Sequence, residues 1–193
     1  NCFMYTNKLV GQLPSSLGSL TKLVSLNIAI NMFTGSIPVT ISNLVALTKL
    51  QVQSNRLVGT IPEGVGSLTK LVTLHINDNA LHGELPASIS KLLSLTSLLI
   101  NSNKLSGAIP PQLGSLTNLA SFRLYTNSFA GVLPNSFTSL VKLTELLLYD
   151  NPAIMGYPAE FCSMTALVSF YLTSRTVHEC YAGSHIALCD LIA

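Results

Sequence analysis

The sequence predicts an α/β solenoid, a fold in which one short structural unit is repeated along an axis. An asparagine returns every 24 residues. A proline follows each of these asparagines by seven positions, and a glycine follows all but the last by four. The asparagines are Asn7, Asn31, Asn55, Asn79, Asn103, Asn127 and Asn151. A fixed period of this size is typical of stacked repeats, so function must be sought in the positions that vary between the copies.

Each unit contains a short strand that ends at the asparagine. Apolar residues occupy the positions five and three before it and alternate with variable residues, as in Leu50-Gln51-Val52-Gln53. This alternation predicts a half-buried strand. Successive units place their strands side by side in parallel, and the rest of each unit supplies the crossover that a parallel pair needs. The sequence therefore predicts one parallel sheet running the length of the stack.

The remaining positions of the unit predict an internal ladder of asparagine side chains, a reversal of chain direction and a short outer segment. The asparagine amide has donors and an acceptor for buried backbone groups that no strand reaches, so stacked copies form an internal polar ladder. Glycine tolerates positive φ and proline fixes φ, which reverses the chain. The outer stretch, as in residues 14–20, is short and rich in serine and glycine. It predicts 3₁₀ turns rather than a long helix.

The unit resembles the plant-type leucine-rich repeat, and the resemblance runs from Cys2 to about Tyr171. The segment LVALTKLQVQSNRLVGTIPEGVGSL, residues 44–68, carries it well. The resemblance implies a right-handed superhelical arc with the parallel sheet on its concave face, short 3₁₀ or irregular convex segments, and a second, smaller sheet. It also implies a receptor ectodomain or a secreted inhibitor of cell-wall enzymes, and hence an extracellular or cell-surface location.

Two regions are expected. Residues 1–174 form about seven leucine-rich repeats, and the set is incomplete at its N-terminus because Cys2 and Met4 already occupy core columns. Residues 175–193 form a C-terminal cysteine cap, because Arg175 stands where the next asparagine is due and the pattern then stops.

Three of the four cysteines lie in or beside the expected cap. We predict a disulfide between Cys162 and Cys189, with Cys180–Cys189 as the alternative, and a disulfide indicates an oxidising, extracellular compartment. A zinc site is a weaker interpretation, because the spacing of its ligands is uncommon. Its ligands would be His178, Cys180, His185 and Cys189. We expect neither a metal nor a cofactor.

Composition excludes several partners. Charged residues make up 9% of the chain and the net charge is +2, which gives no case for nucleic acid binding. Mean hydropathy is +0.50, but the apolar residues are periodic and no unbroken run is long enough to cross a bilayer. Direct membrane insertion is therefore not expected.

The variable strand positions that face outward predict a binding surface in the C-terminal third of the concave face. Aromatic residues and arginine are the types enriched at interface hot spots, and they gather here. The candidate residues are His75, Leu99, Arg123, Tyr125, Leu147, Tyr149 and Tyr171. We predict a non-catalytic recognition module whose partner is a protein or peptide, centred on Tyr125 and Tyr149.

Other interpretations remain open. The tyrosines could stack only to stabilise neighbouring strands. The chain could instead be a structural or assembly subunit of an extracellular coat, filament or large complex, and would then self-assemble. Catalysis is disfavoured: His75, Asp78 and a neighbouring serine could be drawn as a triad, but an open sheet offers no water-excluded pocket.

Overall fold

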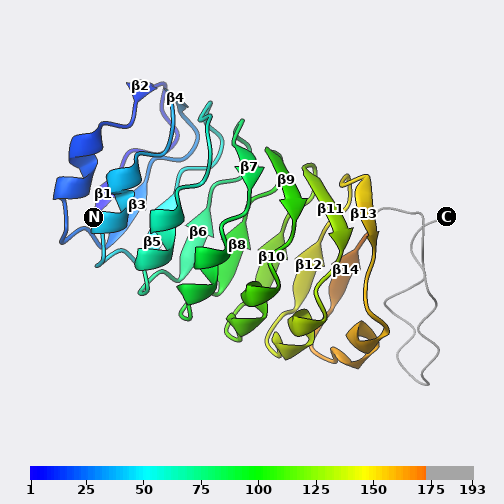
Figure 1. The fold of residues 1–193 in the computed structure, drawn as a ribbon. Coiled ribbons are helices and arrows are strands. Elements are labelled where there is room, and N and C mark those ends of the chain that lie inside the picture. Colours follow the sequence, from blue (N-terminus) through cyan, green and yellow to red (C-terminus); the bar gives the residue numbers. More distant parts are fainter. Residues whose placement is uncertain (173–193) are drawn as a thin grey trace.

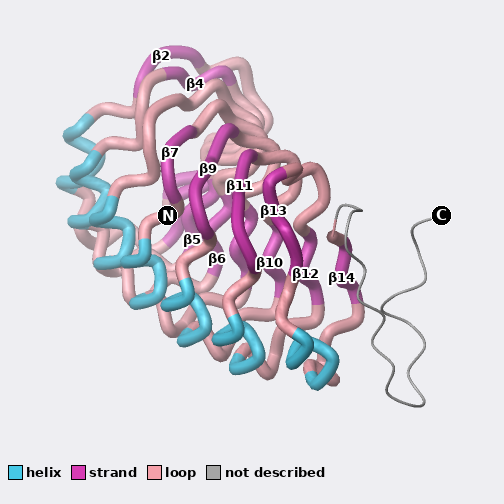
Figure 2. Tube along the Cα trace, turned by 45° about the vertical axis from the view of Figure 1, so that its right-hand side comes forward, coloured by secondary structure: helices cyan, strands magenta, loops and turns pink. Residues whose placement is uncertain are grey.

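The structure is a computed structural model that describes residues 1–172. Figure 1 shows a curved stack of coils, with the first coil at one end and the last described strand at the other. Each coil contributes one strand to a long sheet and one short helix to the opposite side, and Figure 2 shows the helices following one another along that side. The predicted α/β solenoid is confirmed.

The main sheet has eight parallel strands in the order β1-β3-β5-β6-β8-β10-β12-β14. Neighbours pair in a register of 24 residues, so that Phe122 lies opposite both Leu98 and Leu146. This register aligns every column of the repeat and fixes which side chains meet on the concave face. The strands are β1 (Cys2–Phe3), β3 (Ser25–Asn27), β5 (Lys49–Gln51), β6 (Thr73–His75), β8 (Ser97–Leu99), β10 (Ser121–Arg123), β12 (Glu145–Leu147) and β14 (Ser169–Tyr171).

The second sheet forms in two pieces rather than one. One piece is β2 (Val10–Gln12) with β4 (Met32–Thr34), and the other is β7 (His82–Glu84), β9 (Lys104–Ala108), β11 (Ser128–Val132) and β13 (Ala153–Gly156). The third coil lies between the two pieces and contributes no strand to the second sheet. Its backbone is still bonded on both sides, since Arg56 N donates to Phe33 O and Ala80 N donates to Leu57 O, both at 2.8 Å.

The outer segments are single 3₁₀ helices, as the serine- and glycine-rich composition predicted. Each starts directly after the repeat proline, whose fixed φ suits the position. An apolar residue from each helix packs into one continuous core with the leucine columns, and most of these side chains are fully buried. The helices are η1 (Ser15–Ser19), η2 (Val39–Asn43), η3 (Glu63–Ser67), η4 (Ala87–Lys91), η5 (Pro111–Ser115), η6 (Asn135–Ser139) and η7 (Ala159–Ser163).

The asparagine ladder has the role that the sequence predicted. Asn127 Nδ2 donates to the carbonyl oxygens of Leu124 at 2.9 Å and of Ile100, one coil earlier, at 3.1 Å. Its Oδ1 accepts from the backbone N–H of Leu105 at 3.0 Å. From Asn31 onward, each ladder asparagine thus joins two coils through groups that no strand ladder reaches, whereas Asn7 bonds to carbonyls of its own coil. The residue before each asparagine has a positive φ of 53° to 56°, a feature the sequence did not reveal because these residues share no type.

The helices approach one another in pairs, which gives the stack a second period of 48 residues. A Cβ on Gly66 of η3 would lie 2.5 Å from the carbonyl oxygen of Ser88 in η4. The hydroxyl of Ser88 in turn donates to the carbonyl of Glu63 at 2.7 Å. The same arrangement joins Gly18 with Thr40 and Gly114 with Ser136. Only glycine permits so close a contact, so alternate coils have different outer sequences.

The predicted cap, residues 175–193, lies outside the described residues, and so do the candidate zinc ligands. Cys162 is disulfide-bonded and Cys2 is free. Because Cys180 and Cys189 are not described, the pairing stays a prediction. Within residues 1–172 no helix is long and apolar enough to cross a membrane. No group of three or more potential metal ligands occurs in the same range.

Candidate functional site

Five of the seven candidate residues lie on or directly beyond strands β10, β12 and β14 of the concave sheet. Register places Arg123, Leu147 and Tyr171 side by side on these three strands. Tyr125 and Tyr149 follow β10 and β12 by two positions, so they extend the same surface past the strand ends. We call the surface formed by Arg123, Tyr125, Glu145, Leu147, Tyr149 and Tyr171 the aromatic patch. It comes from three consecutive coils, as a solenoid binding surface does.

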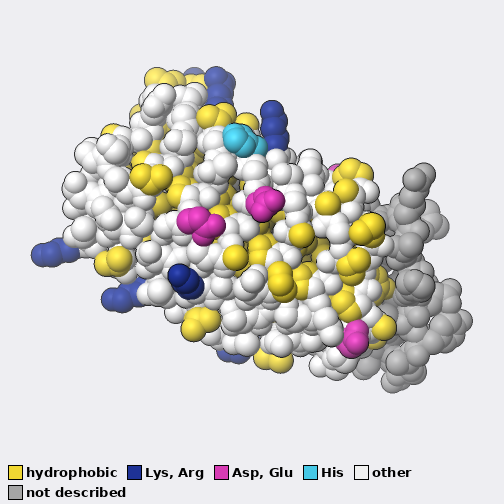
Figure 3. Space-filling view, in the orientation of Figure 1, with side chains coloured by type: hydrophobic (Ala, Val, Ile, Leu, Met, Phe, Trp, Pro, Cys, Tyr) yellow, Lys and Arg dark blue, Asp and Glu magenta, His cyan; other side chains and the backbone are white. Residues whose placement is uncertain are grey.

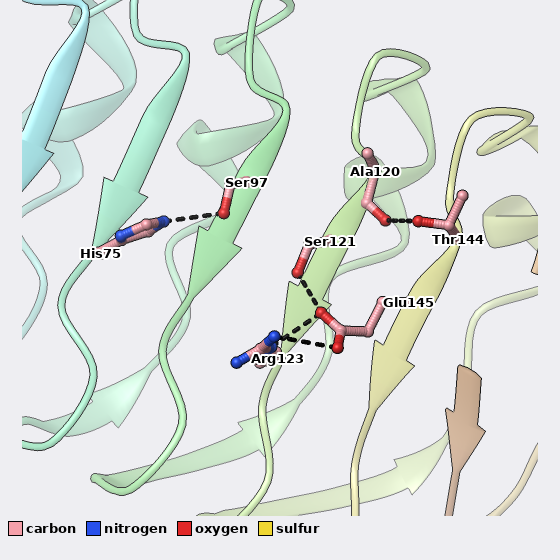
Figure 4. Close-up of polar contacts among 7 residues, drawn as sticks. All are labelled: His75, Ser97, Ala120, Ser121, Arg123, Thr144 and Glu145. Atoms are coloured by element: carbon pink, nitrogen blue, oxygen red, sulfur yellow. Dashed lines mark hydrogen bonds and ion pairs between the residues drawn. The ribbon is translucent and has the colours of Figure 1, made fainter. Parts of the chain in front are cut away.

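Arg123 is held by a two-point ion pair. Its Nε donates to Oε2 of Glu145 at 2.8 Å and its Nη2 donates to Oε1 at 3.1 Å, as Figure 4 shows. Ser121 donates its hydroxyl to the same Oε2 at 2.5 Å. Such a fork fixes the plane of the guanidinium as well as its position. Both oxygens of the carboxylate are therefore occupied by donors from β10.

The protonation states agree with this pairing. The hydrogen bond to Glu145 raises the pKa of Arg123 further above its already high value. Burial disfavours the charged form of Glu145, but the bonds from Arg123 and Ser121 outweigh it and hold the pKa of that carboxyl below its ordinary value. Both groups are charged at neutral pH, and their charges cancel within the patch.

Tyr125 and Tyr149 stack face to face. Their ring centroids are 4.4 Å apart and the ring planes differ by 9°. Burial, followed by the neighbouring phenol of Tyr125, raises the pKa of Tyr149, so the phenol of Tyr149 is neutral at physiological pH. The stack agrees with a strand-stabilising role and with a binding role alike, so its geometry does not decide between them.

His75 and Leu99 form the border of the patch towards the middle of the sheet. His75 lies on β6, and its Nε2 is 2.8 Å from the hydroxyl of Ser97 on β8 (Figure 4). Burial, and then the charge of Arg123, lower the pKa of His75 below its ordinary value. Leu99 on β8 separates the histidine from Arg123 and is half-buried. His75 is thus a neutral neighbour of the patch rather than a member of it.

The structure adds two residues to the candidate set. Glu145 and Ser121 belong to the site because they hold Arg123, and their spacing gives the reason. A residue 22 positions later lies diagonally across the neighbouring strand on the same face, as Glu145 does from Arg123. In the middle of the face Asn101 is only 2% exposed, and its Nδ2 donates to the hydroxyl of Ser102 at 3.3 Å.

The outer side of the molecule offers a different kind of surface. Figure 3 shows that it is largely uncharged, with isolated charged side chains and scattered apolar ones. A groove runs there between the helices η2 to η4 and the second sheet, lined by small side chains and by Glu63 and Glu84. The aromatic patch, by contrast, gathers an ion pair, stacked rings and exposed apolar groups on one sheet face.

The 24-residue coil, the parallel concave sheet and the asparagine ladder together define the class of protein, a leucine-rich repeat solenoid. Comparison with protein families agrees, since the Leucine Rich Repeat model matches residues 46–68, 70–92 and 94–116. The chain belongs to the leucine-rich repeat family, in its plant type. A search of curated proteins finds no match.

Solved structures of plant receptor ectodomains are similar to this chain. The ectodomain of the Arabidopsis thaliana receptor kinase GASSHO1/SCHENGEN3, in complex with CASPARIAN STRIP INTEGRITY FACTOR 2, is 36% identical with a TM-score of 0.83, over 86% of this chain. The Arabidopsis receptor kinase HAESA ectodomain, in complex with an IDA peptide hormone, is 34% identical with a TM-score of 0.82, over 88%. The ectodomain of the Arabidopsis thaliana receptor kinase SOBIR1 is 30% identical with a TM-score of 0.65, over 69%.

These relatives differ in length from this chain. The chain spans 20% of the GASSHO1/SCHENGEN3 ectodomain and 28% of the HAESA ectodomain. It spans 73% of the SOBIR1 ectodomain. The likeness therefore covers nearly all of this chain but only part of the longer receptors, and their activities as whole proteins are not carried over.

Proposed function

We propose that this chain is an extracellular, non-catalytic recognition module that binds a peptide or protein segment on its concave face, at the aromatic patch. The observation that carries the proposal is the ordered gathering of Tyr125, Tyr149, Tyr171 and Leu147 around a fixed ion pair on an open sheet. Tyr171 is 45% exposed, and the stacked pair is half-buried, so large apolar area remains accessible to a partner. Rigid aromatic side chains provide such area at little entropic cost.

Two further facts support the proposal. The similar solved structures include receptor ectodomains, and the HAESA ectodomain is in complex with a peptide hormone. The patch is also pre-ordered, because ion pair, stack and register hold its side chains before any ligand arrives. Pre-ordering lowers the entropic cost of binding.

The experiment is a selection of peptides from a displayed random library against the whole chain, followed by titration of the selected peptides. The double variant Tyr125→Ala/Tyr149→Ala should weaken binding at least about tenfold, since hot-spot truncations cost about 2 kcal/mol or more. Tyr5→Ala is the matched control, because Tyr5 occupies the same repeat column in the first coil and is 55% exposed. Equal binding by the double variant and the control would reject the patch as the site.

Stability measurements on the same variants separate binding from strand support. Loss of a stacked pair costs about 0.5–1.5 kcal/mol, so the double variant should unfold slightly earlier while remaining folded at the titration temperature. A large loss of stability with unchanged peptide affinity would favour the strand-stabilising role. The alternative function, an assembly subunit, predicts self-association, so a monomer in light scattering would count against it.

A further inference from the structure

The aromatic patch contains a cation that is already neutralised. Arg123 uses Nε and Nη2 to hold both oxygens of Glu145, and Oε2 also accepts from Ser121. The pair lies in one sheet face with side-chain exposures of 39% for Arg123 and 24% for Glu145. An anionic ligand group that approaches Arg123 therefore also meets the negative charge of Glu145, which is fixed against the guanidinium at two points.

Other cations lie too far away to replace it. His75 is bonded to Ser97, and burial lowers its pKa, so it is neutral at pH 7. Lys49 is on β5, three strand spacings from β10, which is roughly 14 Å. Strands β6 to β14 of the main sheet, as far as the structure describes them, therefore carry no Lys or Arg other than Arg123.

The unpaired charge closest to the stack in sequence is negative. Asp150 follows Tyr149 directly and is exposed, and its Oδ2 accepts from the hydroxyl of Thr126 at 3.3 Å. Around it the accessible groups are apolar or aromatic: Leu147, Tyr149 and Tyr171. The surface thus favours apolar contact and disfavours a negative ligand, because the carboxylates of Glu145 and Asp150 repel it and Glu145 neutralises the guanidinium.

We propose that the aromatic patch selects ligand segments that present an uncharged aromatic or aliphatic side chain, and rejects segments that present an anionic group there. This inference rests on the proposed function and specifies the ligand class of the same site. Glu145 is a specificity-determining residue in this account. It acts by occupying Arg123, which would otherwise bind a phosphate, sulfate or carboxylate.

The test uses the whole chain and matched peptides. A library-selected peptide that contains tyrosine is prepared with that residue as tyrosine, phenylalanine or phosphotyrosine. Wild type should bind the first two with similar affinity and phosphotyrosine at least tenfold more weakly. Glu145→Gln keeps the shape of the side chain and frees the guanidinium, so it should abolish or reverse this discrimination. The double variant Arg123→Gln/Glu145→Gln should restore rejection of phosphotyrosine, because the freed cation is gone.

Controls make the outcomes distinct. Glu63→Gln makes the same chemical change on η3, away from the concave face, and should leave the discrimination as in wild type. Circular dichroism checks that each variant is folded. Preference of wild type for phosphotyrosine, or unchanged discrimination in Glu145→Gln, would overturn the inference while leaving peptide binding itself intact. Failure of wild type to retain any peptide would instead overturn the proposed function, and this inference with it.

Discussion

Replacing a ladder asparagine should destabilise the solenoid far more than its small side chain suggests. Asn127→Ala removes four hydrogen bonds, three donated by Nδ2 and one accepted by Oδ1. The carbonyls that lose a donor keep another one: Leu124 O accepts from Asn151, and Tyr125 O accepts from Ser102 N. The N–H of Leu105, which is bonded to Oδ1 of Asn127, loses that acceptor.

The loss of stability follows from the bonds that are broken. An orphaned buried donor costs about 1–3 kcal/mol, and the loss of bonds to carbonyls that stay satisfied adds less per bond. We expect a total of about 3 kcal/mol, equivalent to a fall in melting temperature of about 6–12 °C for a chain of this size. Asn135→Ala is the control, since Asn135 is exposed on η6 and should change stability by less than about 0.5 kcal/mol.

The assay is urea unfolding followed by circular dichroism, with the midpoint compared between the two variants and wild type. Coils that contact only their neighbours can unfold separately, so the dependence of the unfolding free energy on urea concentration is compared between the variants as well. If Asn127→Ala shifted the midpoint no more than Asn135→Ala does, the ladder would be a consequence of the fold rather than a cause of its stability.

Three further predictions concern single positions. Ile30 is β-branched and exposed at φ 54°, so Ile30→Asn should raise the free energy of unfolding by about 1 kcal/mol; a decrease in melting temperature would contradict this. Gly66→Ala should lower the free energy of unfolding by about 1–3 kcal/mol, because the new methyl group meets the carbonyl of Ser88. Ser67→Ala on the same helix should leave the melting temperature unchanged in the same experiment. The pKa of His75 is depressed in the folded state, so the unfolded state binds the proton more tightly and the free energy of unfolding should fall as pH drops below roughly 6.5. His75→Gln should make the urea midpoint depend less on pH in that range. An unchanged pH dependence in this variant would argue against the prediction.

The repeat columns were predictable because each is fixed by a backbone requirement that recurs in every coil. The asparagine four residues after each main-sheet strand from β1 to β12, the proline before each 3₁₀ helix and the leucine columns of the core all stand where the period places them. The register of 24 then follows, and with it the grouping of Arg123, Leu147 and Tyr171 on one face. The break in the second sheet was not predictable, because the third coil keeps the same glycine and proline as the others.

The chemistry of the patch was only partly predictable. The sequence indicated which side chains face outward, but not which of them bond to one another. The pairing of Arg123 with Glu145 depends on side-chain rotamers and on Ser121, and it changes the charge available to a ligand. The 48-residue period of the outer helices was visible in the sequence as alternating glycine and serine or threonine, but its cause is the close backbone approach at Gly66 and its equivalents.

The most direct test of the central claim is a crystal structure of the chain with a library-selected peptide bound. We expect the peptide to lie across β10, β12 and β14, with an uncharged side chain against Tyr149 and with Glu145 still bonded to Arg123. A peptide bound instead in the groove between the outer helices and the second sheet, or one whose anionic group has displaced Glu145, would contradict it.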